Sequence, residues 1–169
     1  NDLFIASGDV NAFNGGAGNN TVSYAGSTAG VVVNLNTTVG AMNDAIGDTF
    51  TLIQNLTGTA FDDKLTGLAA GGSILTGGAG ADQLIGLGYT AGNVATANTA
   101  NYAGSSSGVT INLSAVTVDR LNPLGGLAAG AGRGGDAEGD TLSGIQNLVG
   151  SSFNDTFYAS SQTNISVSY

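Results

Sequence analysis

The stretch Gly77–Ile85 holds residue types that could bind a metal cation. It reads Gly-Gly-Ala-Gly-Ala-Asp-Gln-Leu-Ile and matches the nonapeptide pattern G-G-x-G-x-D-x-U-x, in which U is a large apolar residue. Glycines let the chain turn tightly and present backbone carbonyls, because they reach positive φ without strain. The Asp adds a hard anionic oxygen, and Ca²⁺ takes about six to eight oxygen ligands. This stretch therefore predicts a cation-binding turn followed by a short strand that buries Leu84.

The same pattern recurs in register elsewhere in the chain. Gly15–Ser23 is the motif with Asn20 in place of the Asp, and Gly58–Thr66 and Gly150–Tyr158 are further copies. A ten-residue variant, Gly67–Thr76, precedes the full match. A register that is held across several blocks indicates a repeat architecture.

A longer repeat overlies the short one. Tyr24–Ser27 recurs as Tyr102–Ser105, and Ile53–Leu56 recurs as Ile145–Leu148. The two motifs lie further apart in the second copy, so that copy carries an insertion. We assign it to a Gly-rich segment at about residues 114–135, which we expect to leave one coil as a loop. Such a loop can carry contacts or be a tolerated insertion.

The coarse organisation follows from these repeats. We expect one solenoid segment over residues 1–169, with internal repeats at about 15–76 and 93–168. Short segments rich in β-branched residues and bounded by Gly, Asn and Asp predict strands. No apolar stripe of helical period is long enough to predict a helix. The predicted strands are Thr21–Tyr24, Val31–Leu35, Thr49–Leu56, Val109–Leu113 and Thr141–Leu148.

Composition narrows the function classes. The 169 residues include 29 Gly but one Pro, so collagen is excluded, and the net charge of −9 with only three basic residues argues against a nucleic-acid partner. No apolar run approaches the ~18 residues of a membrane span. The chain has no His or Cys for acid–base or nucleophilic catalysis, so we expect no enzyme activity. Paired carboxylates can hydrolyse glycosides, but here their spacing repeats as part of the scaffold.

On these motifs the chain resembles the RTX proteins, which carry haemolysin-type calcium-binding repeats. The resemblance implies an all-β fold, a right-handed parallel β-roll or β-solenoid, here with wider coils and the Gly-rich loop insertion. It also implies Ca²⁺ held between turns of successive coils. In that family a coil comprises two nonapeptides, so every second nonapeptide places its turn on the same edge.

The resemblance implies one strong calcium site. Asp63 and Asp82 are two repeats apart, and one of those repeats is the ten-residue variant. We therefore expect them to lie on one edge, one above the other. Asp62 beside them and the carbonyls of Gly77 and Ala79 complete the expected ligand set.

Three further residues fit the same scheme less well. Asp2 and Asn20 are two nonapeptides apart, but Asn20 contributes no charge. Asp155 holds the acidic position of the last copy. We expect these to be weaker members of the metal-binding set.

A second candidate lies outside the nonapeptides. Asp44 and Asp48 flank a Gly, and the arrangement recurs as Asp136 and Asp140. The two carboxylates of such a pair, separated by a short turn, could close on one cation. They could equally be turn residues that cap strands.

The aromatic residues are expected to be structural. We expect Tyr24 and Tyr102 in the core rather than as surface platforms for glycans. A core ladder is likewise expected of five phenylalanines, namely Phe4, Phe13, Phe61, Phe153 and Phe157.

The functional expectation is an extracellular or bacterial cell-surface structural protein, stabilised by Ca²⁺. Coils at the ends of a solenoid pair readily with another copy, so the expected partners are further copies in a fibre, surface layer, matrix or adhesin stalk. A cell-surface glycan is a further expected partner. The alternative is a calcium-binding repeat domain of a type I-secreted enzyme or toxin whose active module lies elsewhere.

Overall fold

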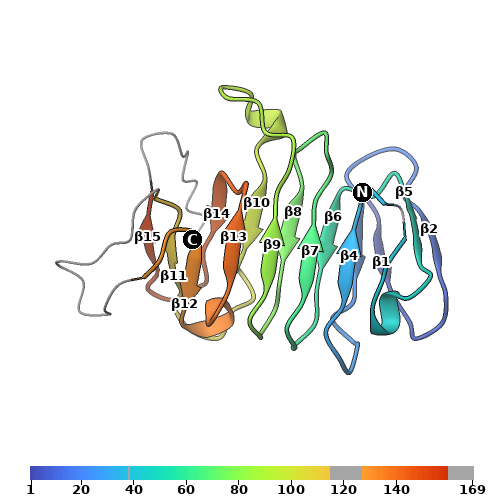
Figure 1. Cartoon of the computed structure of the whole chain (residues 1–169), viewed down its shortest axis with the longest axis horizontal. Helices are drawn as coiled ribbons and strands as arrows, with labels where there is room; N and C mark the ends of the chain where they lie inside the picture. The colour runs from blue at the N-terminus through green and yellow to red at the C-terminus, as the bar shows by residue number, and fades with distance from the viewer. Residues whose placement is uncertain (38, 115–126, 160–169) are drawn as a thin grey trace.

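The computed structural model describes residues 1–37, 39–114 and 127–159, which form a roll of short strands stacked along one long axis (Figure 1). Each strand is three residues long, and the chain passes back and forth between two layers. The expected all-β parallel β-roll is confirmed. The strands are β1 (Leu3–Ile5), β2 (Ala12–Asn14), β3 (Thr21–Ser23), β4 (Val32–Asn34), β5 (Thr49–Thr51), β6 (Asn55–Thr57), β7 (Lys64–Thr66), β8 (Ile74–Thr76), β9 (Gln83–Ile85), β10 (Thr99–Asn101), β11 (Thr110–Asn112), β12 (Ala131–Arg133), β13 (Thr141–Ser143), β14 (Asn147–Val149) and β15 (Thr156–Tyr158). Three short 3₁₀ helices join them: η1 (Asn43–Ala45), η2 (Val94–Thr96) and η3 (Gly135–Ala137).

The first layer is one parallel sheet in chain order, β1-β3-β6-β8-β10-β14. The second layer holds the pair β2-β5 and the sheet β15-β11-β12-β13-β9-β7-β4. Alternate nonapeptides therefore fall in opposite layers, as the register predicts.

The core contains the middle residue of most strands, together with apolar residues of the turns such as Tyr24, Val31 and Ile53. The middle side chain of a three-residue strand points inward, because side chains alternate across a strand. Leu65 pairs with Leu84 across β7 and β9, and both are fully buried. These two leucines occupy the apolar position of the nonapeptide, so the repeat supplies a regular row of core side chains.

Two excursions interrupt the simple coil, one in each long repeat. After β4 the chain turns back and bridges antiparallel to both β4 and β5, and β5 then pairs with β2. After β11 it returns through β12, which is antiparallel to β11 and β13, and β13 pairs with β9. After each excursion the chain therefore returns beside a strand that precedes the excursion: β5 lies beside β2, and β13 lies beside β9.

These excursions correct two predictions. Residues 131–133 of the expected loop insertion form β12 inside the sheet, while residues 115–126 lie outside the described part of the chain. The predicted strand Thr49–Leu56 is two strands in opposite layers, because the chain turns a corner at Leu52, which has a φ of 53°. The physical reason is that a coil this narrow accommodates only three strand residues per layer.

The aromatic predictions are partly confirmed. Tyr24 and Tyr102 are buried, and so is Phe13, with Phe4 and Phe157 packed against the core. The prediction is wrong for two phenylalanines: Phe61 is 46% exposed and Phe153 is 53% exposed. Both stand in the turns that precede β7 and β15 and not at the inward-facing position of a strand.

No helix in the described ranges is long and apolar enough to cross a membrane.

The close stacking of turns gives a first test. A Cβ on Gly30 would overlap the carbonyl of Asp62 in the next turn, whereas a Cβ on Gly26, in the same turn, would meet nothing within 4 Å. We expect Gly30→Ala to lower the free energy of unfolding by about 1–3 kcal/mol, as overpacked sites do. Gly26→Ala should leave it nearly unchanged in urea unfolding. Equal effects of both substitutions would contradict the stacking.

Candidate functional site

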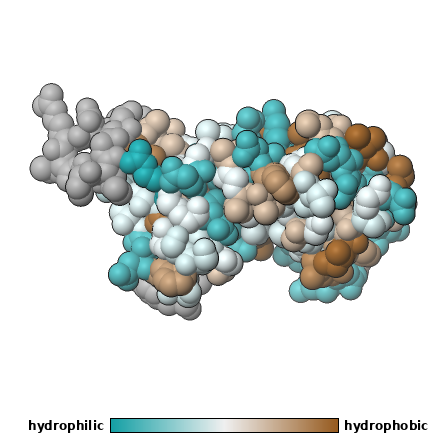
Figure 2. Space-filling view, turned by 90° about the horizontal axis from the view of Figure 1, so that it is seen from below, coloured by the Kyte–Doolittle hydropathy of each residue, from teal (hydrophilic) through white to brown (hydrophobic). Residues whose placement is uncertain are grey.

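Nearly all acidic side chains gather on one side of the roll. Every second-layer strand except β12 begins at the same edge, which we call the acidic edge; it lies at the bottom of Figure 1, where η1 and η3 are drawn. Figure 2 views the roll from below and shows hydrophilic residues there with apolar patches between them. Of the eleven acidic residues that the structure describes, Asp2 alone lies elsewhere. The other ten are Asp9, Asp44, Asp48, Asp62, Asp63, Asp82, Asp136, Glu138, Asp140 and Asp155.

The residues that precede the strands at this edge are joined by one recurring hydrogen bond. The backbone N–H before one strand donates to the carboxylate before the next strand. Asp63 N–H donates to Asp82 Oδ1 at 2.8 Å, and Asp82 N–H donates to Asp140 Oδ1 at 2.8 Å. Val31 N–H donates to Asp63 Oδ1 at 2.6 Å. The same bond joins Asn11 to Asp48 at 2.6 Å and Val109 to Asp155 at 2.9 Å.

This row of bonds places Asp63 and Asp82 on adjacent strands, so their predicted stacking is confirmed. Metal binding by them stays a prediction. Their turns also require glycine at the first nonapeptide position. A Cβ on Gly77 would overlap Asp82 Oδ2, and a Cβ on Gly58 would overlap both Asp63 Oδ2 and the carbonyl of Gly77. The absence of a Cβ therefore lets these carboxylate and carbonyl oxygens pack directly against the glycine backbone.

Asp82 differs from Asp63 in one respect. Asp63 Oδ2 accepts a hydrogen bond from Thr59 N–H at 2.6 Å. Asp82 is fully buried, yet none of the described groups donates to its Oδ2. A buried carboxylate oxygen without a partner is costly, on the order of 1–3 kcal/mol or more for a charged group. A hard cation bound at Asp82 Oδ2 would satisfy it. In the described ranges no three acidic side chains come together, so backbone carbonyls would have to supply the remaining ligands.

Burial raises the pKa values of the three stacked carboxylates Asp63, Asp82 and Asp140, which we call the carboxylate column. It raises the pKa of Asp82 to about 8, with smaller contributions from the neighbouring carboxylates of Asp140 and Asp63. It raises the pKa of Asp140 to about 6, and the pKa of Asp63 also lies above its ordinary value because of burial. Without a cation Asp82 therefore holds a proton near neutral pH, and a divalent cation would favour its ionised form.

The Asp44/Asp48 and Asp136/Asp140 pairs have other partners. Tyr24 donates its hydroxyl to Asp48 Oδ2 at 2.7 Å, and Tyr102 does the same to Asp140 Oδ2 at 2.7 Å. Both oxygens of Asp48 and of Asp140 thus accept hydrogen bonds from the chain itself. These hydrogen bonds agree with the alternative that the carboxylates cap strands. Cation binding by the two pairs stays a prediction.

Sequence reasoning missed the contact between Asp82 and Asp140, which are 58 residues apart. The spacing carries no signal for it, because an excursion separates the two turns. The recurrence of Gly-Asp-Thr in the second long repeat is the one sequence feature that points to an equivalent role for Asp48 and Asp140.

The opposite edge, at which the first-layer strands begin, uses neutral side chains; we call it the amide edge. Asp2 N–H donates to Asn20 Oδ1 at 2.9 Å, and Asn20 N–H donates to Gln54 Oε1 at 2.7 Å. Asn98 N–H likewise donates to Gln146 Oε1 at 2.9 Å. The predicted Asp2/Asn20 pair is therefore adjacent, but Asn20 is already satisfied, since its Nδ2 donates to the carbonyl of Leu52 at 3.1 Å.

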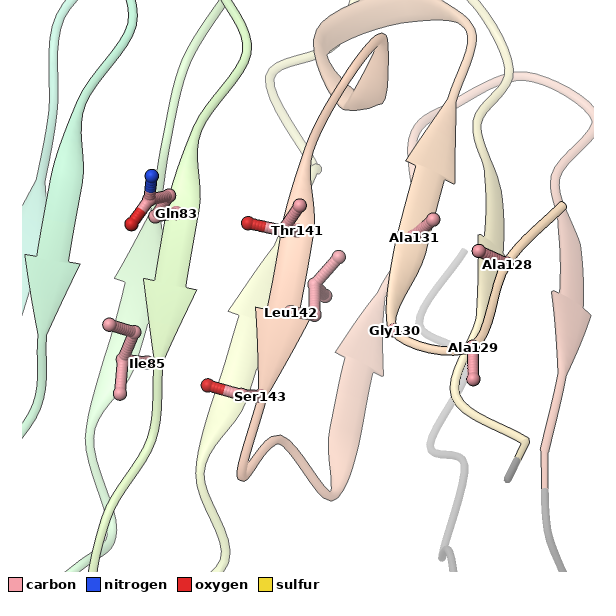
Figure 3. Close-up of a pocket in the computed structure, with 9 residues that line it drawn as sticks. All are labelled: Gln83, Ile85, Ala128, Ala129, Gly130, Ala131, Thr141, Leu142 and Ser143. Carbon is pink, nitrogen blue, oxygen red and sulfur yellow. The ribbon is translucent and has the colours of Figure 1, made fainter. Parts of the chain in front are cut away.

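A hollow of about 290 Å³ lies over β9, β13 and residues 128–131 (Figure 3). Its lining, which includes Gln83, Thr141 and Ser143, holds no ionisable side chain. It therefore offers hydrogen-bonding groups but no acid, base or nucleophile.

The raised pKa values predict the pH dependence of the calcium-free chain. The folded state holds protons that the unfolded chain has already released, so stability falls as the pH rises from about 4 to about 8. Asp82→Asn should flatten this fall and raise stability at neutral pH. Circular dichroism in excess EGTA across that range measures the folded fraction, with Glu138→Gln as a control of equal charge change. Stability that rises with pH in the unsubstituted chain would contradict the assignment.

The comparisons with known proteins agree with this geometry. The family model of the RTX calcium-binding nonapeptide repeat matches four copies, at residues 1–23, 57–88 and 140–165. No curated protein matches the chain. RTX repeats bind calcium and are typical of type I-secreted proteins. The matched segments include Asp63, Asp82, Asp140 and Asp155, so the chain carries RTX calcium-binding nonapeptide repeats.

Proposed function

We propose that the chain binds Ca²⁺ at its acidic edge, between the turns that precede β7 and β9. Asp63 and Asp82 would hold the ion with the carbonyls of Gly77 and Ala79, and Asp62 lies beside them. The unpartnered, buried Oδ2 of Asp82 is the observation that carries this proposal. When bound, Ca²⁺ supplies the positive charge that neutralises a buried carboxylate column.

The amide edge does not require a cation. Its accepting side chains are the amides of Asn20, Gln54 and Gln146, which are uncharged and accept backbone N–H groups as the carboxylates do. Burying an amide that is hydrogen-bonded costs far less than burying an unpaired charge. We therefore place the calcium requirement on one edge of the roll.

We further propose that the chain is an extracellular, non-catalytic scaffold. The sequence has no His or Cys, and most of the buried carboxylate oxygens accept hydrogen bonds from the chain itself. Extracellular modules bind Ca²⁺ at about 10⁻⁴–10⁻³ M. A chain with such a site would remain unfolded during export and fold outside the cell, where Ca²⁺ is abundant.

Assembly with further copies is part of the proposal. None of the described strands pairs with the outer edge of β1, and Leu3 and Ile5 on that strand are 65% and 66% exposed. An unpaired strand edge is a template for another chain. A head-to-tail contact that does not close into a ring would build a fibre or surface layer.

A second candidate is the calcium-binding repeat domain of a type I-secreted enzyme or toxin. The family match favours this candidate, because the residues that it covers are the calcium-binding repeats. In that case the same roll would serve export and folding of an active module elsewhere.

Calcium binding is tested by titration calorimetry and circular dichroism. We expect β-structure to increase on adding Ca²⁺ and to be lost in EGTA. Asp82→Asn should weaken Ca²⁺ binding by about tenfold or more, because it removes a charged ligand. Glu138→Gln, an equal charge change at the same edge, should leave the affinity nearly unchanged. An affinity unaltered by Asp82→Asn would rule out this site.

Assembly is tested by sedimentation and electron microscopy of the calcium-loaded chain. We expect Ile5→Lys to suppress filaments or lattices, because it adds a charge to the exposed edge of β1. Val94→Lys, at a side chain that is 75% exposed in η2, is the matched control and should leave assembly intact. A chain that stays monomeric with saturating Ca²⁺ would favour the second candidate.

A further inference from the structure

A second hollow lies on the outside of the acidic edge. Its volume is about 370 Å³, and it lies between the excursion that carries η1 and the turns before β7 and β9. Met42 and Asn43 line it from the excursion, and Phe61 and Asp62 line it from the turn before β7. The side chains of Asp63 and Asp82 are buried and do not line it, so Asp62 is the one described acidic residue near the proposed calcium position that faces this hollow.

The apolar lining of the hollow is unusually exposed. Phe61 is 46% exposed and Met42 is 49% exposed, so neither contributes a full share to the core. Phe61 occupies the fourth nonapeptide position, where the full match has Gly80 with a φ of 122°. The turn therefore forms without an aromatic residue. Exposed aromatic and Met side chains that line a hollow are typical of binding surfaces.

The charges around the hollow select the ligand. Asp62 is exposed at its rim, and Asp62 Oδ1 accepts a hydrogen bond from Ala81 N–H at 2.8 Å, which holds the carboxylate in place. The edge carries ten carboxylates and the chain has a net charge of −9. The aromatic face, the thioether and the carboxylate are all electron-rich. A cation with an apolar stem complements all three, whereas an anion or a second acidic edge would be repelled.

We propose that this hollow binds an arginine or lysine side chain presented by a basic segment of a partner protein. The methylene stem lies against Phe61 and Met42, and the cationic head lies at Asp62. A cation over an exposed aromatic ring contributes modestly, and so does an exposed ion pair. A single contact is therefore weak, and a partner with several basic residues gains affinity from the acidic edge as a whole.

The chain contains its own control for this site. Phe153 stands in the equivalent turn of the second long repeat and is 53% exposed. In that repeat Asn154 replaces Asp62 and Gly134 replaces Met42. The second position thus keeps the aromatic ring but lacks the thioether and the carboxylate next to the ring, and its nearby carboxylate, Glu138, accepts a hydrogen bond from Gly134 N–H at 2.8 Å. We expect it to bind the cation more weakly than the first position.

The test uses Met42 as a reporter, because it is the one Met in the sequence. Calcium-loaded protein labelled with ¹³C at the Met methyl is titrated with the peptide acetyl-Gly-Arg-Gly-Arg-Gly-amide. The matched probe has citrulline in place of arginine, which keeps the shape and removes the charge. We expect a saturable shift of the methyl resonance with the arginine peptide alone. Phe61→Ala and Asp62→Asn should each weaken binding by about threefold or more, and Phe153→Ala should leave it unchanged.

Several outcomes would overturn the proposal. An equal shift with the citrulline peptide would show that the hollow does not distinguish a charged side chain from a neutral one of the same shape. Undiminished binding in both Phe61→Ala and Asp62→Asn would place the peptide elsewhere. A shift with methyl glucoside, or with protein concentration alone, would assign the hollow to a neutral sugar or to a second copy. Circular dichroism of each variant with Ca²⁺ checks that the roll is intact.

Discussion

The roll depends on one interaction that recurs at both edges. The residue before each strand has to satisfy a backbone N–H from the neighbouring coil, and a short side-chain acceptor does this. Asp63 N–H to Asp82 Oδ1 and Asn20 N–H to Gln54 Oε1 are the same bond with different acceptors. Because buried backbone donors are almost always paired, this bond sets the register of the stack. The three-residue strands add one buried apolar side chain each and have little else to hold them.

The choice of acceptor separates structure from metal chemistry. Amides at one edge satisfy the donors at no electrostatic cost, so that edge is self-sufficient. Carboxylates at the other edge do the same but bury charge, and burial raises their pKa values. Where a Tyr hydroxyl completes the hydrogen bonding, as at Asp48 and Asp140, the carboxylate is satisfied internally. Asp82 lacks such a donor among the described groups, and there a cation has the most to contribute.

The two excursions extend this scheme. Each excursion inserts an antiparallel segment into the second layer. Each also brings to the acidic edge an Asp that accepts a hydrogen bond from a Tyr hydroxyl. At that Asp one stack of turns ends and the next begins. The first excursion also places Met42 beside Phe61 in the lining of the outer hollow. In the second, Gly134 stands at the equivalent position. The excursions are therefore where the two long repeats, otherwise so similar, acquire different surfaces.

The sequence by itself determined the features that depend on local spacing. The nonapeptide register predicted the inward apolar residues, and the resemblance to RTX repeats that it supports implied parallel strands and the stacking of Asp63 on Asp82, because each rests on contacts between successive coils. It did not predict that residues 131–133 form a strand, that Asp140 lies against Asp82, or that Phe61 is exposed. The strand and the Asp140 contact depend on the direction in which the chain returns after β11, and an antiparallel return leaves no periodic signal. Only the tertiary structure decided that the acidic residues share one edge, since that follows from which layer each strand joins.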